Sequence, residues 1–303
     1  MTMLQPAPYP GELPGRSAVA RVRGRSLTDD ALRRLRRNKA AMTASAVLAF
    51  LVLAALVGPY LVPFGYDQIN KNDVWAPPLT QGHLLGADFL GRDILARLLI
   101  GLRVSLAVGV TATVVSLVIG VLWGATAGYL GGRVDEAMMR VVDVIYALPF
   151  IFFVILLMVT FGRSFILMFA AIGAVEWLTM ARIVRGQTLS LKQKEFVEAA
   201  RAAGVSSFGI IRRHVIPNLL GPVVVYVTLT IPAVILAESF LSFLGLGVQE
   251  PLTSLGTLIS KGAQDMALAW WTLVFPAVAM VVTLVCFNFI GDGLRDALDP
   301  KDR

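Results

Sequence analysis

Two carboxylic acids stand among apolar residues, where an ionisable side chain is costly unless it has a partner or faces a cavity. Glu176 lies deep within one apolar run and precedes Trp177, whereas Glu238 lies at the edge of another. Both are candidate residues of a translocation pathway. The alternatives are a contact with a neighbouring helix for Glu176 and, for Glu238, a position from which the carboxylate reaches the membrane surface.

The remaining residues that could do chemistry exclude several classes of protein. No Gly-x-x-x-x-Gly-Lys-Ser/Thr run occurs, so the chain lacks the loop that cradles ATP phosphates, and we expect no cofactor or metal on it. The one cysteine, Cys286, excludes an intramolecular disulfide and a multi-cysteine metal cluster. His83 and His214 fall on opposite sides of the predicted membrane, so they cannot share a catalytic or metal site.

The composition is that of a membrane protein. Of 303 residues, 56% are hydrophobic and only 16% are charged, whereas a soluble domain carries about 25% charged residues. Six runs are long enough to cross a hydrocarbon core of about 30 Å as helices, and Glu176 is the one charge within them. These runs are residues 42–62, 104–127, 144–161, 164–181, 216–237 and 266–290.

Prolines and glycines within the runs predict local features of the helices. Pro149 interrupts the third run and predicts a kink, because proline cannot donate a backbone hydrogen bond. Gly120, Gly124 and Gly128 recur every four residues on one face of the second run, a spacing that permits close helix packing. We expect this face to pack within the chain.

The distribution of basic residues predicts the orientation of the spans. With the N-terminus inside, 21 of the 27 Lys and Arg residues fall on the cytoplasmic side, as the positive-inside rule requires. Both termini are therefore predicted to be cytoplasmic, with a short basic helix over residues 27–42 lying on membrane lipid. The net charge of +7 is explained by basic residues at the cytoplasmic ends of the spans. It therefore does not indicate binding to nucleic acid, and we expect no nucleic acid as a partner.

Two predicted outer segments are too long to be simple turns. In residues 63–103, the charged residues Asp88, Arg92, Asp93 and Arg97 are spaced as in an amphipathic helix lying on the membrane surface. Residues 240–265 begin apolar and are rich in glycine, and we expect them to dip back into the protein.

A long polar segment, residues 182–215, separates the fourth and fifth runs on the predicted cytoplasmic side. Residues 194–203 contain no proline or glycine and favour a helix. Gly204 ends that helix, serines follow in the turn, and residues 208–215 form a second helix that leads to Pro217. The segment is predicted to be a helix, a turn and a helix outside the membrane.

Six residues of this segment stand at a distinctive spacing: Glu198, Ala199, Ala200, Gly204, His214 and Pro217. Their pattern resembles the EAA loop of ATP-binding-cassette importer permeases, on which the ATPase subunit docks. The family pattern ends in Ile, any residue, Leu and Pro, so His214 and Ile216 depart from it. The resemblance implies that these six residues, with Glu195, form the ATPase-coupling loop.

The resemblance extends over almost the whole chain. Residues 86–97, 128–143, 180–198, 240–247 and 287–303 look like the C-type membrane subunits of peptide permeases. The stretch MARIVRGQTLSLKQKEF and the final residues are most similar to the oligopeptide group. The implied fold is an all-α polytopic membrane protein with six transmembrane helices and a cytoplasmic coupling-helix loop, the type I importer architecture.

The same resemblance implies a domain organisation and partners. Residues 1–41 form a cytoplasmic tail and interfacial helix, residues 42–290 a permease domain and residues 291–303 a second cytoplasmic tail. The chain would lie in a bacterial cytoplasmic membrane with a second, homologous permease subunit. Two ATPase subunits would hold ATP and Mg, and an extracytoplasmic binding protein would deliver peptide.

The implied function is ATP-driven import of oligopeptides by alternating access, with no catalysis by this chain itself. A permease for dipeptides or nickel in the same family is an alternative. From another class, an ion-coupled secondary transporter would use Glu176 and Glu238 as coupling carboxylates. Secondary transporters often contain a repeat between their two halves, and none is evident in this sequence.

Overall fold

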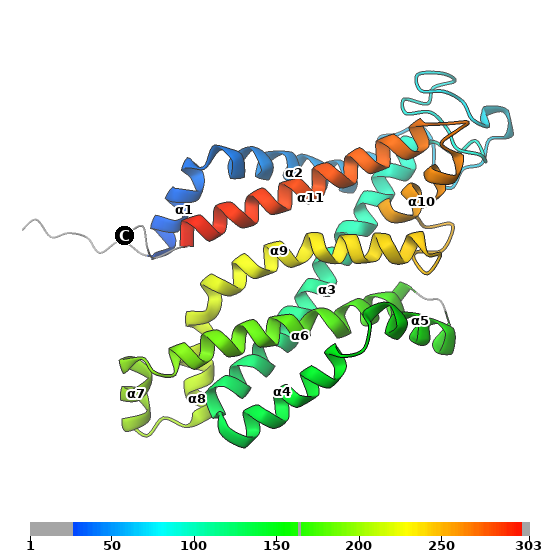
Figure 1. Ribbon diagram of the computed structural model, residues 1–303. Coiled ribbons are helices and arrows are strands. Elements are labelled where there is room, and N and C mark those ends of the chain that lie inside the picture. The colour runs from blue at the N-terminus through cyan, green and yellow to red at the C-terminus, as the bar shows by residue number, and fades with distance from the viewer. Residues whose placement is uncertain (1–26, 163–164, 299–303) are drawn as a thin grey trace, which may run out of the picture.

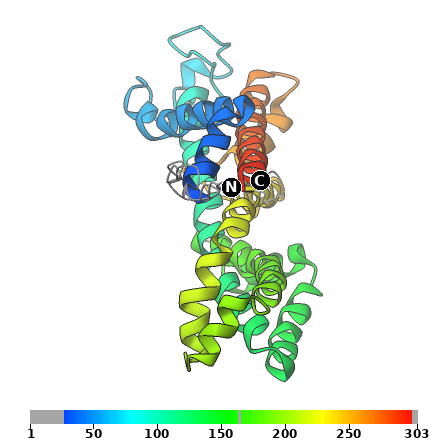
Figure 2. The ribbon, with the colours of Figure 1, turned by 90° about the vertical axis from the view of Figure 1, so that its left-hand side faces the viewer.

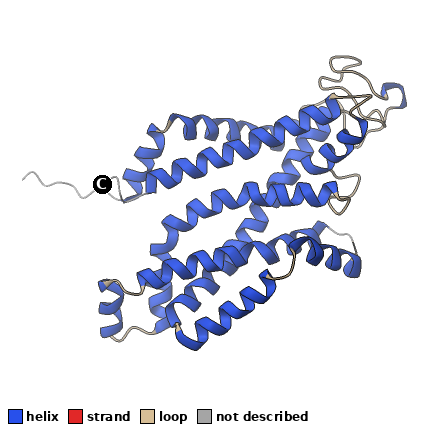
Figure 3. Ribbon diagram, in the orientation of Figure 1, coloured by secondary structure: helices blue, strands red, loops and turns tan. Residues whose placement is uncertain are grey.

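The computed structural model describes residues 27–162 and 165–298, and these residues fold almost entirely into helices (Figure 1 and Figure 3). The all-α prediction is thereby confirmed for this part of the chain. Its α-helices are α1 (Leu27–Arg37), α2 (Lys39–Val57), α3 (Ile94–Leu130), α4 (Gly132–Tyr146), α5 (Phe150–Phe161), α6 (Phe165–Leu191), α7 (Glu195–Ala202), α8 (Ser207–Ile210), α9 (Ile216–Phe243), α10 (Leu255–Asp265) and α11 (Trp271–Leu298). Shorter elements are the 3-10 turns η1 (Gly58–Tyr60) and η2 (Lys71–Asp73) and the π-helical segment η3 (Ile211–Val215).

The long helices are stacked side by side, with α2 and α11 on one flank, α9 in the middle and α6 and α4 on the other flank, while α3 crosses them diagonally (Figure 1). Figure 2, a view from the end that carries α7, shows the same order. The beginning of α1, the end of α11 and α7 lie at this end, which we call the inner end. The segment between α2 and α3 lies with α10 at the opposite, outer end (Figure 1).

Four helical segments are long and apolar enough to cross a membrane: Lys39–Tyr60, Ile94–Leu130, Ser207–Phe243 and Trp271–Leu298. A bent pair, α4 with α5, makes a fifth if it is counted as one span. These segments overlap the predicted first, second, fifth and sixth runs, with shifted ends. The predicted total of six spans stays a prediction, because the described residues show four to five.

The third predicted run, residues 144–161, is not one straight helix. α4 ends at Tyr146, α5 begins at Phe150, and the two helices are bent by 79°. Pro149 stands at the N-cap of α5, where its ring removes a donor and disfavours helical geometry in the residue before it. The interruption predicted at Pro149 is therefore confirmed. It ends one helix and begins another, however, instead of bending one continuous helix.

The fourth predicted run, residues 164–181, continues as α6 to Leu191, nearly three turns into the predicted loop. The extension has a partner on α3. Val184 and Thr188 of the extension are fully buried, and they face the glycine stripe of α3. The helix continues beyond the apolar run because packing, and not membrane burial, stabilises its last turns.

The glycine stripe of α3 forms the groove that receives α6. A β-carbon on Gly120 would lie 2.5 Å from a Met180 side-chain atom, and one on Gly124 would lie 2.4 Å from the Ala181 carbonyl oxygen. At Gly128 the nearest atom, in Thr188, would be 2.8 Å away. Real contacts are not this short, so the two backbones approach as closely as they do only because side chains are absent. The prediction of close packing within the chain is confirmed.

The predicted surface helix in residues 63–103 is wrong. Asp88, Arg92 and Asp93 lie in an irregular segment, Arg97 lies in the first turns of α3, and all four side chains are buried. The segment cannot continue as a helix, because its backbone has positive φ angles at several residues, including 72° at Gly91. Its charged side chains bind one another and adjacent segments instead of lying on lipid.

A buried histidine joins this segment to the beginning of α3. His83 Nδ1 lies 2.8 Å from Asp93 Oδ1, and His83 Nε2 lies 3.2 Å from Asp73 Oδ2. The second oxygen of Asp93 accepts a hydrogen bond from the Ala96 backbone at 2.7 Å and so caps α3. The Phe64 ring stacks on His83, with the ring centres 4.3 Å apart. The histidine therefore has a structural role at the outer end.

The prediction that residues 240–265 dip back into the protein is confirmed by α10. Leu255 and Leu258 of this helix are buried, and Ser254 caps it by accepting a hydrogen bond from the Thr257 backbone at 3.1 Å. A β-carbon on Gly256 would lie 2.4 Å from Ser239 Cα in α9, so α10 is wedged tightly against that helix.

Candidate functional site

The predicted helix–turn–helix in residues 182–215 is present. Its first ten residues belong to α6, which is a correction to the predicted boundary, and α7 then forms the first separate helix. After the turn at Gly204, α8 and η3 continue directly into α9. The segment from α7 to η3, which we call the coupling loop, projects from the inner end between two long helices (Figure 1).

Gly204 gives the turn its shape through its backbone conformation. Its φ is 78°, a left-handed value that side chains disfavour. The Gly204 N–H donates to the Arg201 carbonyl oxygen at 3.0 Å, and the Val205 N–H donates to the Ala200 carbonyl oxygen at 3.1 Å. Ser206 then caps α8 by accepting from the Gly209 N–H at 3.2 Å. A β-carbon on Gly204 would meet no atom within 4 Å, so space is not the constraint.

One face of α7 packs against the rest of the chain. Val197 is fully buried and Ala200 is 8% exposed. They join a buried apolar cluster drawn from α3, α6, α8, η3 and α9: Ala125, Tyr129, Met180, Val184, Ile210, Ile211, Val215, Leu219 and Val223. Ala200 therefore contacts this chain, whereas Ala199 remains exposed. The cluster connects α7 mechanically to α3, α6 and α9.

The opposite face of the coupling loop is exposed and carries both charge and aromatic surface. Glu195, Glu198 and Ala199 are exposed on α7, and Gly204 is exposed at the turn. Phe196 is 41% exposed, and Phe208 of α8 is 72% exposed. Exposed aromatic rings are typical of a protein interface rather than of a solvated loop.

The remaining two predicted coupling residues lie where the loop meets α9. His214 is half-buried, with its ring 6.5 Å from that of Phe196, and its carbonyl oxygen accepts a hydrogen bond from Asn218 Nδ2 at 2.7 Å. Pro217 is exposed in the first turn of α9, where a proline is compatible with the helix. The fold thus places six of the seven predicted residues in the coupling loop and the seventh, Pro217, in the first turn of α9 directly after it.

Glu238 is not at the membrane surface, so that alternative is wrong. Its side chain is fully buried. Ser105 Oγ of α3 donates to Glu238 Oε2 at 3.2 Å, and Ser242 Oγ donates to Oε1 at 2.6 Å. Ser105 Oγ also accepts from the Leu255 N–H at 3.1 Å. The carboxylate therefore joins α3 and α9 to the beginning of α10, and hydroxyl donors offset the cost of its burial.

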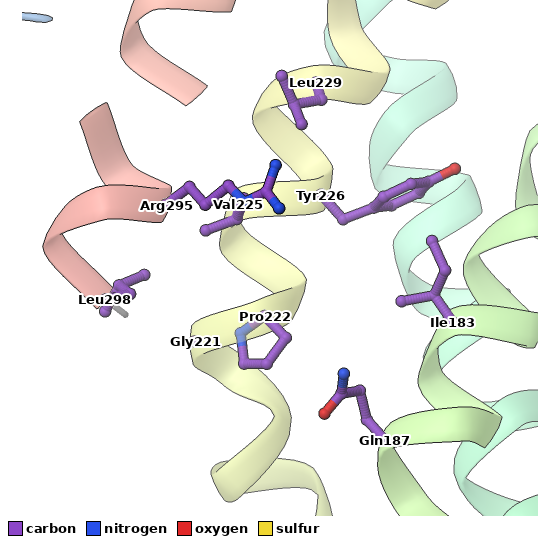
Figure 4. A pocket seen from close by; sticks show the side chains of 9 residues that line it. All are labelled: Ile183, Gln187, Gly221, Pro222, Val225, Tyr226, Leu229, Arg295 and Leu298. Atoms are coloured by element: carbon purple, nitrogen blue, oxygen red, sulfur yellow. The ribbon is translucent and has the colours of Figure 1, made fainter. Parts of the chain in front are cut away.

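Glu176 is half-buried on α6 and makes no hydrogen bond or ion pair with the described residues. Further along α6 toward the inner end, a pocket of about 530 Å³ lies between α6, α9 and α11. Its polar groups are Gln187, Tyr226 and Arg295, and Arg295 extends from α11 toward Val225 of α9 (Figure 4). The pocket is open and its lining is mostly apolar, from residues Ile183, Gly221, Pro222, Val225, Leu229 and Leu298.

Sequence reasoning missed an ion network at the outer end. Arg92 donates to Asp88 at 2.8 Å and to Glu250 at 3.1 Å, and Lys261 also donates to Glu250. Arg97 lies 3.6 Å from Asp88 and is 1% exposed. The network ties the segment before α3 to α10, although more than 150 residues separate Arg92 from Glu250.

Glu250→Gln should lower the melting temperature of the solubilised protein at neutral pH. Partial burial alone would raise the pKa of Glu250, but Lys261 and Arg92 outweigh it and hold the pKa at about 2. A lowered carboxyl pKa stabilises the folded state above the ordinary value of 4.5, and this contribution is lost as the pH falls toward 2.

Melting curves of both proteins from pH 8 downward would measure this effect. The difference in melting temperature between the two proteins should be constant above about pH 5 and should decrease below pH 4.5. It should be small, because Glu250 is 44% exposed. Asp67→Asn, at an exposed acid of the same end, is the control and should show no such gap. A Glu250→Gln gap that widened on acidification would contradict the ion network.

Comparison with known proteins gives the family. Residues 116–303 match the family of binding-protein-dependent transport system inner membrane components, and residues 26–78 match the N-terminal transmembrane domain of oligopeptide transport permease C. The chain belongs to the family of binding-protein-dependent transport system inner membrane components. It is therefore a membrane component of a transport system, as the EAA-like spacing of the coupling loop predicted.

Several individual relatives match this chain over nearly its whole length. The chain is 56% identical to the oligopeptide transport system permease protein OppC of Escherichia coli K12, over 93% of this chain and 94% of the relative. It is 54% identical to OppC of Haemophilus influenzae (92% and 90% covered) and 46% identical to the dipeptide transport system permease protein DppC of Bacillus subtilis (92% and 87%).

The comparison with solved structures supports the fold. A chain of the inward-facing MetNI methionine ABC transporter matches 67% of this chain and 96% of its own length with a TM-score of 0.55. At 20% sequence identity this likeness shows the fold alone. The predicted architecture of a type I importer permease is thereby confirmed.

Proposed function

We propose that this chain is the membrane-spanning permease subunit of an ATP-driven importer of oligopeptides. The observation that carries the proposal is the coupling loop, a packed helix–turn–helix with an exposed face, in a chain whose near full-length relatives are oligopeptide permeases. The relatives that share 54–56% identity with this chain are OppC proteins, which favours oligopeptides as the substrate. ATP and Mg would bind to the partner ATPases, for which this chain provides a docking surface.

The coupling loop is suited to carry motion from an ATPase into the membrane. The buried face of α7 is held by Val197 and Ala200 within the apolar cluster, so displacement of α7 displaces the ends of α3, α6 and α9. The exposed face of the coupling loop presents Glu195, Glu198 and Phe208 to a partner. Closure of the ATPases would thus rock the long helices and switch the pathway between inward-facing and outward-facing states.

The pathway itself would form between this chain and a second, homologous permease subunit. Glu176 makes no hydrogen bond or ion pair with the described residues and lies on α6, the same helix that lines the inner pocket with Gln187. We place Glu176 and this pocket on the pathway, while the enclosed position of Glu238 favours a role in holding α10. An extracytoplasmic binding protein would deliver the peptide at the outer end.

The proposed setting is a bacterial cytoplasmic membrane with both termini inside. Residues 1–41 and 291–303 would then be the cytoplasmic tails of a permease domain over residues 42–290. The ends of α1 and α11 and the coupling loop share one end of the molecule, which supports this orientation (Figure 1). The exposed arginines of α1, including Arg33, Arg36 and Arg37, suit contact with anionic lipid.

Glu198→Arg should weaken the association of this chain with its ATPase subunits. An exposed carboxylate that becomes buried against a basic partner residue contributes enough that its reversal lowers affinity about tenfold or more. Co-purification of the ATPases with the tagged chain, measured over a series of salt concentrations, checks this. Asp67→Arg makes the same charge change at an exposed outer residue and should leave association unchanged. Equal ATPase recovery with both variants would contradict the docking assignment.

A further inference from the structure

Two ion pairs join α4 to the part of α6 that lies beyond the predicted span. Arg185 donates from Nε to one carboxylate oxygen of Asp135 at 2.6 Å and from Nη2 to the other at 2.7 Å. Nearer the outer end, Arg182 donates from Nη2 to Asp143 at 2.8 Å. Its guanidinium also lies 4.2 Å from the centre of the Tyr146 ring.

The two pairs differ in strength. The Arg185 side chain is 36% exposed, but that of Asp135 is only 11% exposed, and the pair is bidentate, a geometry that fixes orientation as well as distance. The Arg182 and Asp143 side chains are 38% and 57% exposed, so solvent and salt screen that pair. The Asp135–Arg185 pair is therefore the one that can hold α4 in register with α6, and the exposed pair offers a natural control.

The end of α3, against which α4 and α6 both pack, touches the coupling loop directly. Tyr129, at the end of α3, is almost fully buried, and the cationic groups of Arg201 on α7 and Lys192 just after α6 lie 5.9 and 5.8 Å from its ring centre. Together with the α3 groove at Gly124 and Gly128, these contacts pack the inner halves of α3, α4 and α6 as one unit against α7.

Beyond the apolar cluster that joins α6 to α9, this unit also borders open space. The open pocket of about 530 Å³ separates α6 from the inner ends of α9 and α11. A displacement of α7 can therefore change the width of this pocket, because the apolar contacts between α6 and α9 lack the fixed geometry of the bidentate pair. Movement between α6 and α4, by contrast, would break the bidentate pair and leave Asp135 poorly solvated.

We propose that the Asp135–Arg185 pair makes α4 move with α6, so that displacement of the coupling loop is delivered to the bent span formed by α4 and α5. The inference rests on the proposed function. Neither residue contacts substrate in this role, so both are positioning residues. Their loss should separate ATP hydrolysis from transport, because α6 would still respond to the ATPases while the bent span would not follow it.

Charge reversal and exchange test the proposal in the complete complex in proteoliposomes. The measured quantity is the amount of peptide taken up per ATP hydrolysed. Asp135→Arg and Arg185→Asp should each lower this ratio about tenfold, with ATP hydrolysis largely retained, and the double exchange should recover most of it. Arg185→Lys keeps the charge but loses the bidentate geometry, and should give an intermediate ratio. Arg182→Asp and Asp143→Arg should change the ratio less than twofold.

Two results would overturn the inference. The first is an unchanged ratio in both single reversals. The second is a defect, whether in the ratio or in assembly, that the double exchange does not repair. Failure of the proposed function itself would look different, because the unaltered complex would then show no ATP-dependent uptake at all.

Distances between spin labels provide a readout that a general loss of stability would not mimic. With Cys286 replaced, labels on Glu136 of α4 and Ser190 of α6 should give the same distance with and without nucleotide. Labels on Ser190 and on Asn218 of α9 should give a distance that changes. The proposal is wrong if the α4–α6 distance changes as much as the α6–α9 distance does.

Discussion

Gly204→Val is expected to abolish peptide uptake while leaving the chain inserted in the membrane. The residue has a φ of 78°, where a β-branched side chain is a severe outlier and even an unbranched one costs about 1–2 kcal/mol. The turn would relax to another conformation and shift α7 relative to α8. Because no atom lies within 4 Å of the added β-carbon, no clash opposes insertion of the chain.

The measurement is peptide uptake and ATP hydrolysis by the reconstituted complex, with the amount of chain in the membrane determined in parallel. Uptake should fall to background, and hydrolysis should no longer respond to the binding protein and its peptide. Gly204→Asn is the matched control, because asparagine tolerates left-handed backbone conformations, and should retain a substantial part of the uptake. Normal uptake and regulated hydrolysis in Gly204→Val would contradict the role of this turn in coupling.

Gly124→Val is expected to prevent stable assembly. The β-carbon alone would lie 2.4 Å from the Ala181 carbonyl oxygen and 2.9 Å from the Arg185 backbone nitrogen. Backbone atoms in the middle of a packed helix cannot rotate away as a flexible side chain can, so α6 as a whole must separate from α3. Overpacking of this kind typically costs about 1–3 kcal/mol and occasionally more, and here it also disturbs the helix that leads to the coupling loop.

The amount of full-length chain in the membrane and the melting temperature of the solubilised complex report this effect. Gly124→Ala should lower the melting temperature by several degrees, and Gly124→Val should leave little assembled complex. Gly186→Val, on the exposed face of α6 with nothing within 4 Å of the β-carbon, is the control for valine in a helix. Equal stability of the two valine variants would contradict the close α3–α6 contact.

The helices and the coupling loop were predictable because each depends on local patterns. Long apolar runs predict membrane helices, and the spacing from Glu198 to Pro217 predicts the helix–turn–helix. The four-residue glycine repeat predicted close packing, but the partner helix could not be known from it. Helix ends were less predictable, since α6 reaches Leu191 only because α3 supplies a surface against which its last turns are buried.

The charged residues show where sequence reasoning failed. Asp88 to Arg97 has the spacing of a surface helix, yet glycines with positive φ and partners distant in sequence, such as Glu250, turn it into a buried ion network. For Glu238 the sequence left open a place on the pathway and a position at the membrane surface, and only the three-dimensional arrangement shows the serines that enclose it. The pairing of Asp135 with Arg185 has no sequence signal of its own, because it requires the register of α4 against α6.

ATP-dependent uptake of a labelled oligopeptide by proteoliposomes tests the central proposal most directly. The vesicles would contain this chain with its partner permease and ATPases, and the binding protein would be added outside with an ionophore that abolishes ion gradients. We expect uptake that requires internal ATP and continues in the presence of the ionophore. Uptake driven by an ion gradient without ATP, or lost with the ionophore while ATP remains high, would contradict the assignment as an ATP-driven importer subunit.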